Sequence, residues 1–260
     1  MSSAPPIVLS FAGADPTCGA GLQADVLTLA SMGCHPLSVV TAITVQDTSG
    51  VERVQAVESP LVIRQAEALL AEMRVAAFKL GVLGSSANAQ AIAKILAAHR
   101  ETPVVLDPVL ASGRGDALGT EDMLRDHVLP QATIVTPNSL EARRLANRPS
   151  LRECAAALLD RGAEYVLITG THEPGEAVVN TLYDGGGVVR EDRWPRLAGS
   201  YHGSGCTLAS AIAAALANGL AMPEAVRDAQ EFTWQTLAAG FQPGRGQLIP
   251  DRFFWAHDQE

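Results

Sequence analysis

The chain has 260 residues, of which 47% are hydrophobic, and a formal net charge of −9. A chain of this length can bury a large core, and its composition excludes an intrinsically disordered protein. The acidic balance argues against a nucleic-acid surface or an anionic membrane as partner. It does not exclude phosphate ligands, because local backbone N–H groups can bind these regardless of net charge.

Targeting and metal signals are lacking in the sequence. The first six residues, MSSAPP, carry no basic region and no apolar run, and apolar stretches elsewhere are too short to span a membrane. The four cysteines (Cys18, Cys34, Cys154 and Cys206) are scattered, and the six histidines show no zinc-binding spacing. We therefore expect a cytoplasmic protein without zinc, a membrane partner or a nucleic-acid partner.

The first elements form a strand, a glycine-rich loop and a helix. We expect them at residues 7–12, 13–21 and 22–32, with Gly33 ending the helix, and a β-branched strand follows at 37–45. This order is typical of an α/β protein that binds its ligand at the carboxyl ends of the strands. The loop matches neither the dinucleotide-binding nor the P-loop pattern.

Two polar residues in this region are candidates for ligand contacts. Asp25 lies early in the 22–32 helix, where the helix dipole stabilises a carboxylate, and the alternative is a surface residue near the helix end. Gln46 follows the 37–45 strand in a turn closed by Gly50. Its amide both donates and accepts, so it either reads the edge of a heterocycle or caps the turn.

The middle of the chain repeats the alternation of strands and helices. We expect helices at 61–73 and 86–99, and strands at 76–80, 104–106 and 133–135. Asp107 follows a strand directly. In this place it either binds a metal or transfers a proton, or it starts an Asp-Pro turn.

Asn138 and Glu141 follow the 133–135 strand. Their spacing fits a helix capping box, and the competing interpretation is a hard cation held through water.

The remaining elements complete one α/β domain. We expect a strand at 165–169, a hairpin at 177–183 and 187–190, helices at 209–218 and 225–239, and an irregular tail at 244–247. No repeat or linker divides the chain. The sequence predicts a single domain over 1–260, with 1–6 and about 241–260 peripheral, and a central, mainly parallel sheet covered by helices on both faces. Loops near 13–21, 46, 81–84, 107–116, 138–141 and 199–206 should converge on one crevice.

The glycine-rich loop at 199–208 runs into the 209–218 helix. Gly203 and Gly205 let the backbone turn N–H groups inward, and the helix start adds further donors, which together predict an anion site. Cys206 lies where the positive end of the helix dipole would lower the pKa of a thiol. A negative ligand beside a potential base suggests group transfer from a phosphate. The alternative is a tight turn with Cys206 as inert packing.

Seven pieces of sequence, in order, carry a family resemblance: 12–16, 19–25, 41–48, 79–83, 106–109, 136–141 and 202–208. Together they span roughly residues 7 to 240. They resemble the hydroxymethylpyrimidine/phosphomethylpyrimidine kinase family of thiamine biosynthesis, which belongs to the ribokinase-like superfamily. The resemblance implies phosphorylation of 4-amino-5-hydroxymethyl-2-methylpyrimidine, and then of its monophosphate, with ATP and Mg²⁺ as cofactors. It also suggests a homodimer.

The same resemblance assigns the substrate and catalytic positions. Cys206 occupies the position of the catalytic base, where the sugar kinases of the superfamily carry Asp. The residues implied to hold the pyrimidine are Gly13, Asp25, Gln46, Val82 and Val109, and those implied to form the anion hole are Gly203, Ser204 and Gly205.

It assigns the nucleotide site as well. The residues implied there are Asp107, Asn138, Glu141, Thr169 and His202. Asn138 and Glu141 would organise magnesium through water, and Asp107 lies near the same phosphates.

Several positions depart from the family pattern. Val82 stands where Met is usual, and Thr169 replaces the Lys of a Lys-Gly-Gly-His motif, which removes a positive contact to the nucleotide phosphates. Cys18, Tyr201 and the 243–246 tail also differ.

The competing functions are a pyridoxal kinase, since pyridoxal also carries a hydroxymethyl group, and a pyrimidine-binding protein with a weak nucleotide site. A cysteine hydrolase lacks the expected nucleophile elbow.

Overall fold

The computed structural model describes residues 4–110 and 121–257. Within these residues nine strands form one sheet in the order β3-β2-β1-β4-β5-β6-β7-β8-β9. The strands are β1 (Ile7–Ala14), β2 (His35–Asp47), β3 (Gly50–Ala56), β4 (Ala77–Leu80), β5 (Val104–Leu106), β6 (Ile134–Val135), β7 (Tyr165–Thr169), β8 (Ala177–Asp184) and β9 (Gly187–Pro195). The expected α/β class with a mainly parallel sheet is confirmed.

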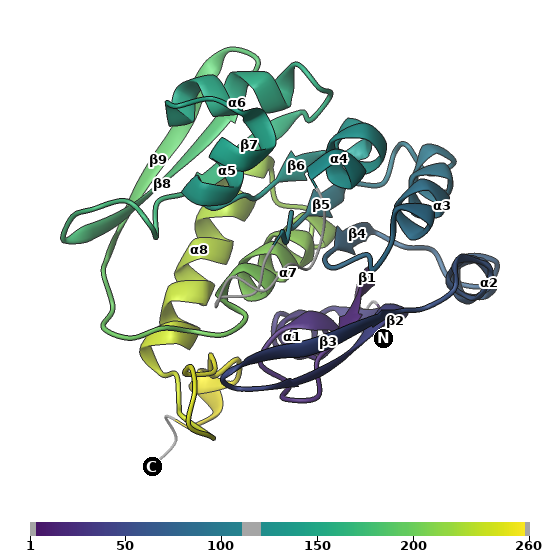
Figure 1. The fold of residues 1–260 in the computed structure, drawn as a ribbon, viewed down its shortest axis with the longest axis horizontal. Coiled ribbons are helices and arrows are strands. Elements are labelled where there is room, and N and C mark those ends of the chain that lie inside the picture. The colour runs from purple at the N-terminus through teal and green to yellow at the C-terminus, as the bar shows by residue number, and fades with distance from the viewer. Residues whose placement is uncertain (1–3, 111–120, 258–260) are drawn as a thin grey trace.

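The parallel strands occupy the middle of the sheet. β2, β1, β4, β5, β6 and β7 pair in parallel, whereas β3 pairs antiparallel to β2, and β8 and β9 continue antiparallel beyond β7. The antiparallel extensions therefore lie at opposite edges of the sheet (Figure 1). Because the parallel strands run in one direction, their carboxyl ends bring the candidate loops to the same edge.

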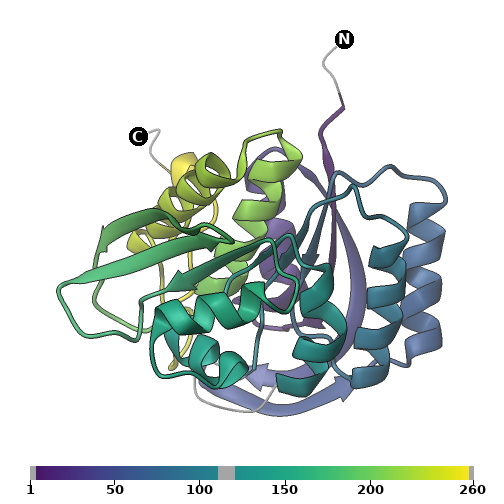
Figure 2. The same cartoon turned by 90° about the horizontal axis from the view of Figure 1, so that it is seen from above.

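Helices cover both faces of the sheet, as Figure 2 shows from above. The helices are α1 (Gly21–Ser31), α2 (Ser59–Leu70), α3 (Ser86–Ala97), α4 (Glu121–Met123), α5 (Ser139–Ala146), α6 (Leu151–Leu159), α7 (Ser204–Ala217) and α8 (Met222–Ala238), with short turns at Leu124–Val128, Leu129–Gln131 and Phe254–Ala256. Buried side chains of α2, α3, α5 and α6 form one core, and those of α1, α7 and α8 form the other. Side chains along β1 alternate between the two faces of the sheet. Leu9 and Phe11 pack in the core with α2, α3, α5 and α6, and Val8 packs in the core with α1, α7 and α8.

Several elements differ from the sequence-based expectation, among them β2, which runs on to Asp47 and so includes Gln46, and β9, which extends to Pro195. β3 begins at Gly50, where only a turn is expected, because this edge strand has no buried residue and lacks a strong hydrophobic signal. α6 is missed although Ser150 and Glu153 form a capping box at its start. α7 begins at Ser204 rather than at residue 209, so Gly205 and Cys206 belong to the first turn of the helix and not to the loop.

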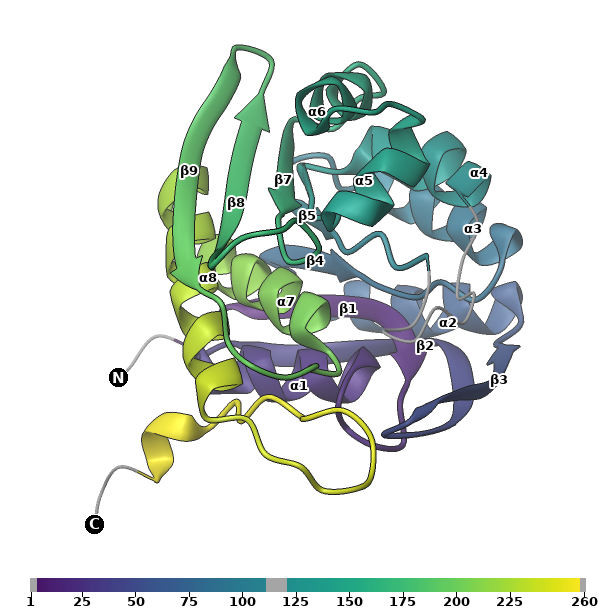
Figure 3. The same cartoon turned by 60° about the vertical axis from the view of Figure 1, so that its left-hand side comes forward.

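The segment after α8 curves back along α1 toward the start of α7 (Figure 3). Leu248 pairs with the 200–202 backbone, and Ile249 pairs with Phe241. Arg252 is only 3% exposed, and its guanidinium donates to the Gly19 carbonyl at 2.6 Å. The expectation of a peripheral 241–260 segment is therefore wrong for Arg252, whose contacts tie the tail to the β1–α1 loop.

Across residues 4–110 and 121–257, no helix is both long and apolar enough to cross a membrane. The four cysteines are free thiols, with Cys18 exposed, Cys34 and Cys154 buried, and Cys206 partly buried.

Candidate functional site

The start of α7 carries the residues that are expected to form the anion site, and we call this group of residues the cradle. Gly203 is the N-cap residue in a left-handed conformation (φ +82°), and Thr207 N makes the first intrahelical hydrogen bond, to the Gly203 carbonyl at 2.9 Å. The N–H groups of Ser204, Gly205 and Cys206 precede that bond, so the helix supplies no carbonyl acceptors for them. These three donors have no hydrogen-bond partner within residues 4–110 and 121–257, and their place at the positive end of a 14-residue helix suits a phosphate.

Glycine is required at 203 for space as well as for conformation. A Cβ at Gly203 would lie 1.8 Å from the Gly19 carbonyl oxygen, and a Cβ at Gly21 would lie 2.4 Å from the Gly13 carbonyl oxygen. The β1–α1 loop and the start of α7 therefore touch backbone to backbone. Gly203 serves this approach between the β1–α1 loop and α7, whereas Gly21 serves a close approach between the start of α1 and the end of β1.

We expect Gly203→Ala to lower kcat/KM by about 10²-fold or more, since a collision of this size must displace the cradle by about an ångström. Steady-state kinetics at saturating ATP measures this. Gly219→Ala is the matched control, because Gly219 follows the other end of α7 with φ +89° and open space around its Cα. It should reduce stability by about 1 kcal/mol through backbone strain alone and leave the kinetics unchanged. Equal kinetic losses in both variants would contradict the close-approach account.

Asp25 is part of a buried ion pair. Its Oδ1 lies 2.8 Å from Lys79 Nζ and accepts a hydrogen bond from Ser210 Oγ at 2.8 Å, and both charged side chains are fully buried. Lys79 belongs to β4, between Phe78 and Leu80 on the opposite face, so strand alternation points it toward α1 and α7. Asp25 Oδ2 has no hydrogen-bond partner among the described residues.

This pair corrects the expectation that the helix dipole stabilises Asp25. α1 begins at Gly21, its first turn contains no acidic residue, and Asp25 follows that turn. The lysine provides the compensating charge instead. Burial alone lowers the pKa of Lys79, but the Asp25 carboxylate and the more distant Asp107 outweigh it and hold that pKa above its ordinary value. Lys79 is therefore a permanent positive charge beneath the site, and the view of Asp25 as a surface helix-end residue is wrong.

Cys206 and Asp107 lie together above this ion pair. Asp107 is 5% exposed, its Oδ2 lacks a hydrogen-bond partner among the described residues, and its carboxyl hydrogen-bonds the Cys206 thiol. Burial raises the pKa of Asp107 despite Lys79. Burial also raises the pKa of Cys206 to about 12, with Asp107 and Asp25 adding to it and Lys79 opposing it. The expected lowering of the Cys206 pKa is therefore wrong for this arrangement, because desolvation and two carboxylates exceed the helix dipole.

Asn138 and Glu141 form the capping box that their spacing predicts. Asn138 Oδ1 accepts from the Leu140 and Glu141 N–H groups at 3.0 Å each, and Glu141 Oε2 accepts from Asn138 N at 3.0 Å. Burial raises the pKa of Glu141 to about 8, and the negative charge of Asp107 adds to it. Thr169 lies beside the cap, since its N–H donates to the Pro137 carbonyl at 3.0 Å. The structure thus brings together four of the five expected nucleotide-site residues.

The expected ring contacts line the ends of β1, β4 and β5. A Cβ at Gly13 would lie 3.7 Å from Val82 Cβ, so these two positions adjoin. Val82 is held by its backbone, whose carbonyl accepts from Thr41 Oγ1 at 2.5 Å. Val109 is half-buried, and its N–H donates to the Asp107 carbonyl at 2.9 Å. The expected 107–116 loop falls outside the described residues from 111 onward.

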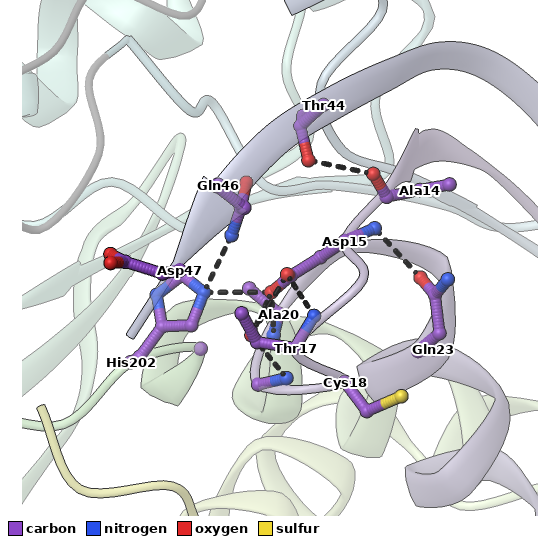
Figure 4. Close-up of polar contacts among 12 residues, drawn as sticks. Ala14, Asp15, Thr17, Cys18, Ala20, Gln23, Thr44, Gln46, Asp47 and His202 are labelled. Atoms are coloured by element: carbon purple, nitrogen blue, oxygen red, sulfur yellow. Dashed lines mark hydrogen bonds and ion pairs between the residues drawn. The ribbon is translucent and has the colours of Figure 1, made fainter. Parts of the chain in front are cut away.

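Gln46 contacts His202, which in turn contacts Asp15 (Figure 4). The His202 Nε2 atom lies 2.7 Å from Asp15 Oδ2 and 3.1 Å from the Gln46 side-chain amide. A bulge in the β2–β3 pairing lies directly before Gln46 and re-aims its side chain. Thus His202 contacts a residue expected to hold the substrate, although the sequence groups it with the nucleotide site.

No role is predicted from the sequence for Asp15, Lys79 or Arg252. A lysine within the otherwise apolar β4 strand is a usable signal, because a fully buried lysine needs a partner charge. Asp15 and Arg252 gave no such signal, since their partners lie 187 and 233 residues away in the chain.

Comparisons with known proteins identify the family of this chain. A family model described as phosphomethylpyrimidine kinase matches residues 15–251. The hydroxymethylpyrimidine/phosphomethylpyrimidine kinase of Streptomyces coelicolor is 40% identical over 264 residues, covering 97% of this chain and 96% of that protein.

Two solved structures are also similar. The pyridoxal kinase of Staphylococcus aureus in complex with ADP has a TM-score of 0.90 at 28% identity, covering 98% of this chain and 96% of that one. The phosphomethylpyrimidine kinase of Clostridium difficile 630 has a TM-score of 0.78 at 30% identity, covering 89% and 99%. The match over 15–251 and the 40% identity across nearly the whole chain establish that this chain belongs to the phosphomethylpyrimidine kinase family.

Proposed function

We propose that the protein transfers the γ-phosphoryl group of ATP to 4-amino-5-hydroxymethyl-2-methylpyrimidine and then to its monophosphate, in thiamine biosynthesis. The observation that carries this proposal is the start of α7, where three N–H groups without a hydrogen-bond partner among the described residues adjoin Cys206, Asp107 and the buried Lys79. Phosphoryl transfer passes through a loose transition state, so positioned donors and charges supply most of the catalysis.

The test is release of ADP by the purified protein with the hydroxymethylpyrimidine, its monophosphate and pyridoxal as parallel substrates. We expect a kcat/KM at least about 10-fold higher with the pyrimidine than with pyridoxal. A preference for pyridoxal would favour the second candidate, which the similarity to the Staphylococcus aureus pyridoxal kinase motivates. Saturable pyrimidine binding without turnover would favour a pyrimidine-binding protein. That alternative is motivated by Thr169, which stands where the family carries a lysine.

The residues around Asp107 fit a magnesium ion with the nucleotide phosphates. Asp107 Oδ2 is buried without a hydrogen-bond partner among the described residues, and its charge raises the pKa of Glu141, so two carboxylates lie near each other. In the described part of the chain no group of three or more His, Cys, Asp or Glu forms a cage. Mg²⁺ suits such a site, because it binds one or two carboxylates and completes its shell with phosphate oxygens and water. Asp107, Asn138 and Glu141 would hold it, and it would neutralise charge on the transferred phosphoryl group.

We expect Glu141→Ala to raise the Mg²⁺ concentration needed for half-maximal activity by about 10-fold, because the variant removes one of the two carboxylates. Magnesium titration of the steady-state rate measures this. Glu153→Ala is the matched control, since Glu153 completes an equivalent capping box on α6. Both variants should lose about 1 kcal/mol of stability. If Glu141→Ala lost only that stability, Glu141 would be a helix cap and nothing more.

The pH dependence of stability gives a separate check. The folded-state pKa of Glu141 is raised from 4.5 to about 8, so its contribution to stability is present below the unfolded value and lost as pH rises through about 8. Without Mg²⁺, we therefore expect the melting temperature to fall across this window, and the Glu141→Gln variant to fall less. Differential scanning calorimetry measures it. An identical profile for the two proteins would show that Glu141 is not the titrating group.

Two further properties belong to the same proposal. Ile43 and Val45 of β2 are exposed by 57% and 51%, and these apolar side chains on the face of the sheet suit a homodimer contact. Sedimentation equilibrium with Val45→Glu tests it, since a dimer using this surface should dissociate. The four free thiols suit the reducing cytoplasm.

A further inference from the structure

Asp15, at the end of β1, is surrounded by hydrogen-bond donors. Its side chain is buried, and its oxygens accept from the Thr17 N–H, the Thr17 hydroxyl and the Ala20 N–H, each at 2.8 Å (Figure 4). Burial alone raises the pKa of Asp15, but hydrogen bonds from His202 and from this loop outweigh it and lower that pKa below its ordinary value. Asp15 is therefore an ionised carboxylate that only accepts hydrogen bonds.

The acceptor role of Asp15 fixes the protonation of one ring nitrogen. His202 Nε2 lies 2.7 Å from Asp15 Oδ2, so Nε2 carries a hydrogen and donates it. The ring is also confined in space, because a Cβ at Gly19 would lie 2.3 Å from His202 Cδ2. His202 thus presents an N–H group at one defined place, between Asp15 and Gln46.

The Gln46 amide shares this nitrogen at 3.1 Å. The amide nitrogen occupies that position in the structure, but a ring nitrogen that already donates has no lone pair for an NH₂ group. A half-turn of the amide brings Oε1 to the same place, where it can share the N–H of His202. Hydrogen-bond chemistry therefore puts the Gln46 carbonyl toward His202 and the NH₂ group on the opposite side of the amide.

We propose that Asp15 and His202 are positioning residues that hold Gln46 as a hydrogen-bond donor toward the substrate, so that the site selects a heterocycle with an unprotonated ring nitrogen. This rests on the proposed function, which takes a pyrimidine as the occupant. A ring nitrogen with a free lone pair accepts from the amide NH₂. A heterocycle that presents an N–H there would set donor against donor and be rejected.

A double-mutant cycle tests the coupling of His202 to Gln46. The measurement is calorimetric binding of 4-amino-5-hydroxymethyl-2-methylpyrimidine to the wild type, His202→Phe, Gln46→Ala and the double variant. His202→Phe keeps an aromatic ring beside Gly19 but removes the N–H. We expect each single variant to bind about 10-fold more weakly, the value of one hydrogen bond, and the double variant to bind no more weakly than Gln46→Ala. Losses that multiply to about 100-fold would overturn the proposal.

A second measurement needs no substrate and no folded variant. Long-range ¹H–¹⁵N correlation spectra of ligand-free protein labelled with ¹⁵N-histidine report which nitrogen of each of the six histidines is protonated. The wild-type signal assigned to His202 should show a protonated Nε2, whereas a bare Nε2 with a protonated Nδ1 would refute the proposal. This measurement tests the orientation of Gln46 independently of the proposed function. A protein that does not bind the pyrimidine loses the proposed function, yet its His202 tautomer still decides the orientation of Gln46.

Discussion

Cys206→Ala should lower kcat by about 10²–10⁴-fold and leave pyrimidine binding nearly unchanged, which is the loss expected when a general base is removed. The thiol lies in the first turn of α7, hydrogen-bonded to Asp107 and beside the N–H donors of the helix start. Single-turnover kinetics with saturating Mg·ATP measures the chemical step, and calorimetry measures binding of the pyrimidine.

The raised pKa of Cys206 sets a condition on its role as a base. At about 12, the thiol is protonated at neutral pH, so it can act as a base only when the surrounding negative charge is neutralised. Asp107 is one source of that charge, and the same residue is proposed to hold magnesium. Cys154→Ala is the control, since Cys154 is a buried thiol in the core on the other face of the sheet and should cost stability without changing kcat. An unchanged kcat in Cys206→Ala would remove the thiol from the chemistry.

Lys79→Met should reduce the free energy of unfolding by about 3–5 kcal/mol, because it leaves the Asp25 carboxylate buried without its partner charge. The side chains of this pair are fully buried, so water cannot replace the lost interaction. Urea denaturation followed by circular dichroism measures the loss. Activity should fall with it, since Asp25 links α1 to Ser210 on α7, the helix that carries the cradle.

Two controls separate the ion pair from the lysine itself. Lys79→Met combined with Asp25→Asn removes both charges, and we expect this double variant to be more stable than Lys79→Met alone. Lys94→Met changes an exposed lysine on α3 and should shift stability by less than about 0.5 kcal/mol. If the double variant were as unstable as the sum of its single changes, Asp25 and Lys79 would not act as a pair.

Local signals predicted the elements that depend on local sequence. The 165–169 strand and the Asn138–Glu141 capping box are confirmed as expected, since a β-branched run and a side-chain cap need only neighbouring residues. Of the residues expected to form the anion cradle, Ser204 and Gly205 lie inside α7 rather than before it, and Gly203 is its N-cap residue. By contrast, β3 is held by pairing to β2 along an exposed edge, and its own sequence does not show that pairing.

The charges of the site depend on contacts between distant parts of the chain. The pKa of Cys206 was expected to fall from its helix position alone, whereas burial and carboxylates from α1 and the end of β5 raise it. Asp25 was expected to need only its own helix, but its partner is Lys79 on β4. Likewise, Arg252 contacts the β1–α1 loop from the end of the chain. Family resemblance supplied positions for the site, but not these charges.

The most direct test of the central claim follows the products of a single reaction over time. Purified protein is mixed with Mg·ATP and 4-amino-5-hydroxymethyl-2-methylpyrimidine, and samples are resolved by mass spectrometry. We expect the pyrimidine monophosphate to appear first and the diphosphate to follow, with one ADP released for each phosphoryl group transferred. ADP release without a phosphorylated pyrimidine, or no turnover at any Mg²⁺ concentration, would contradict the account.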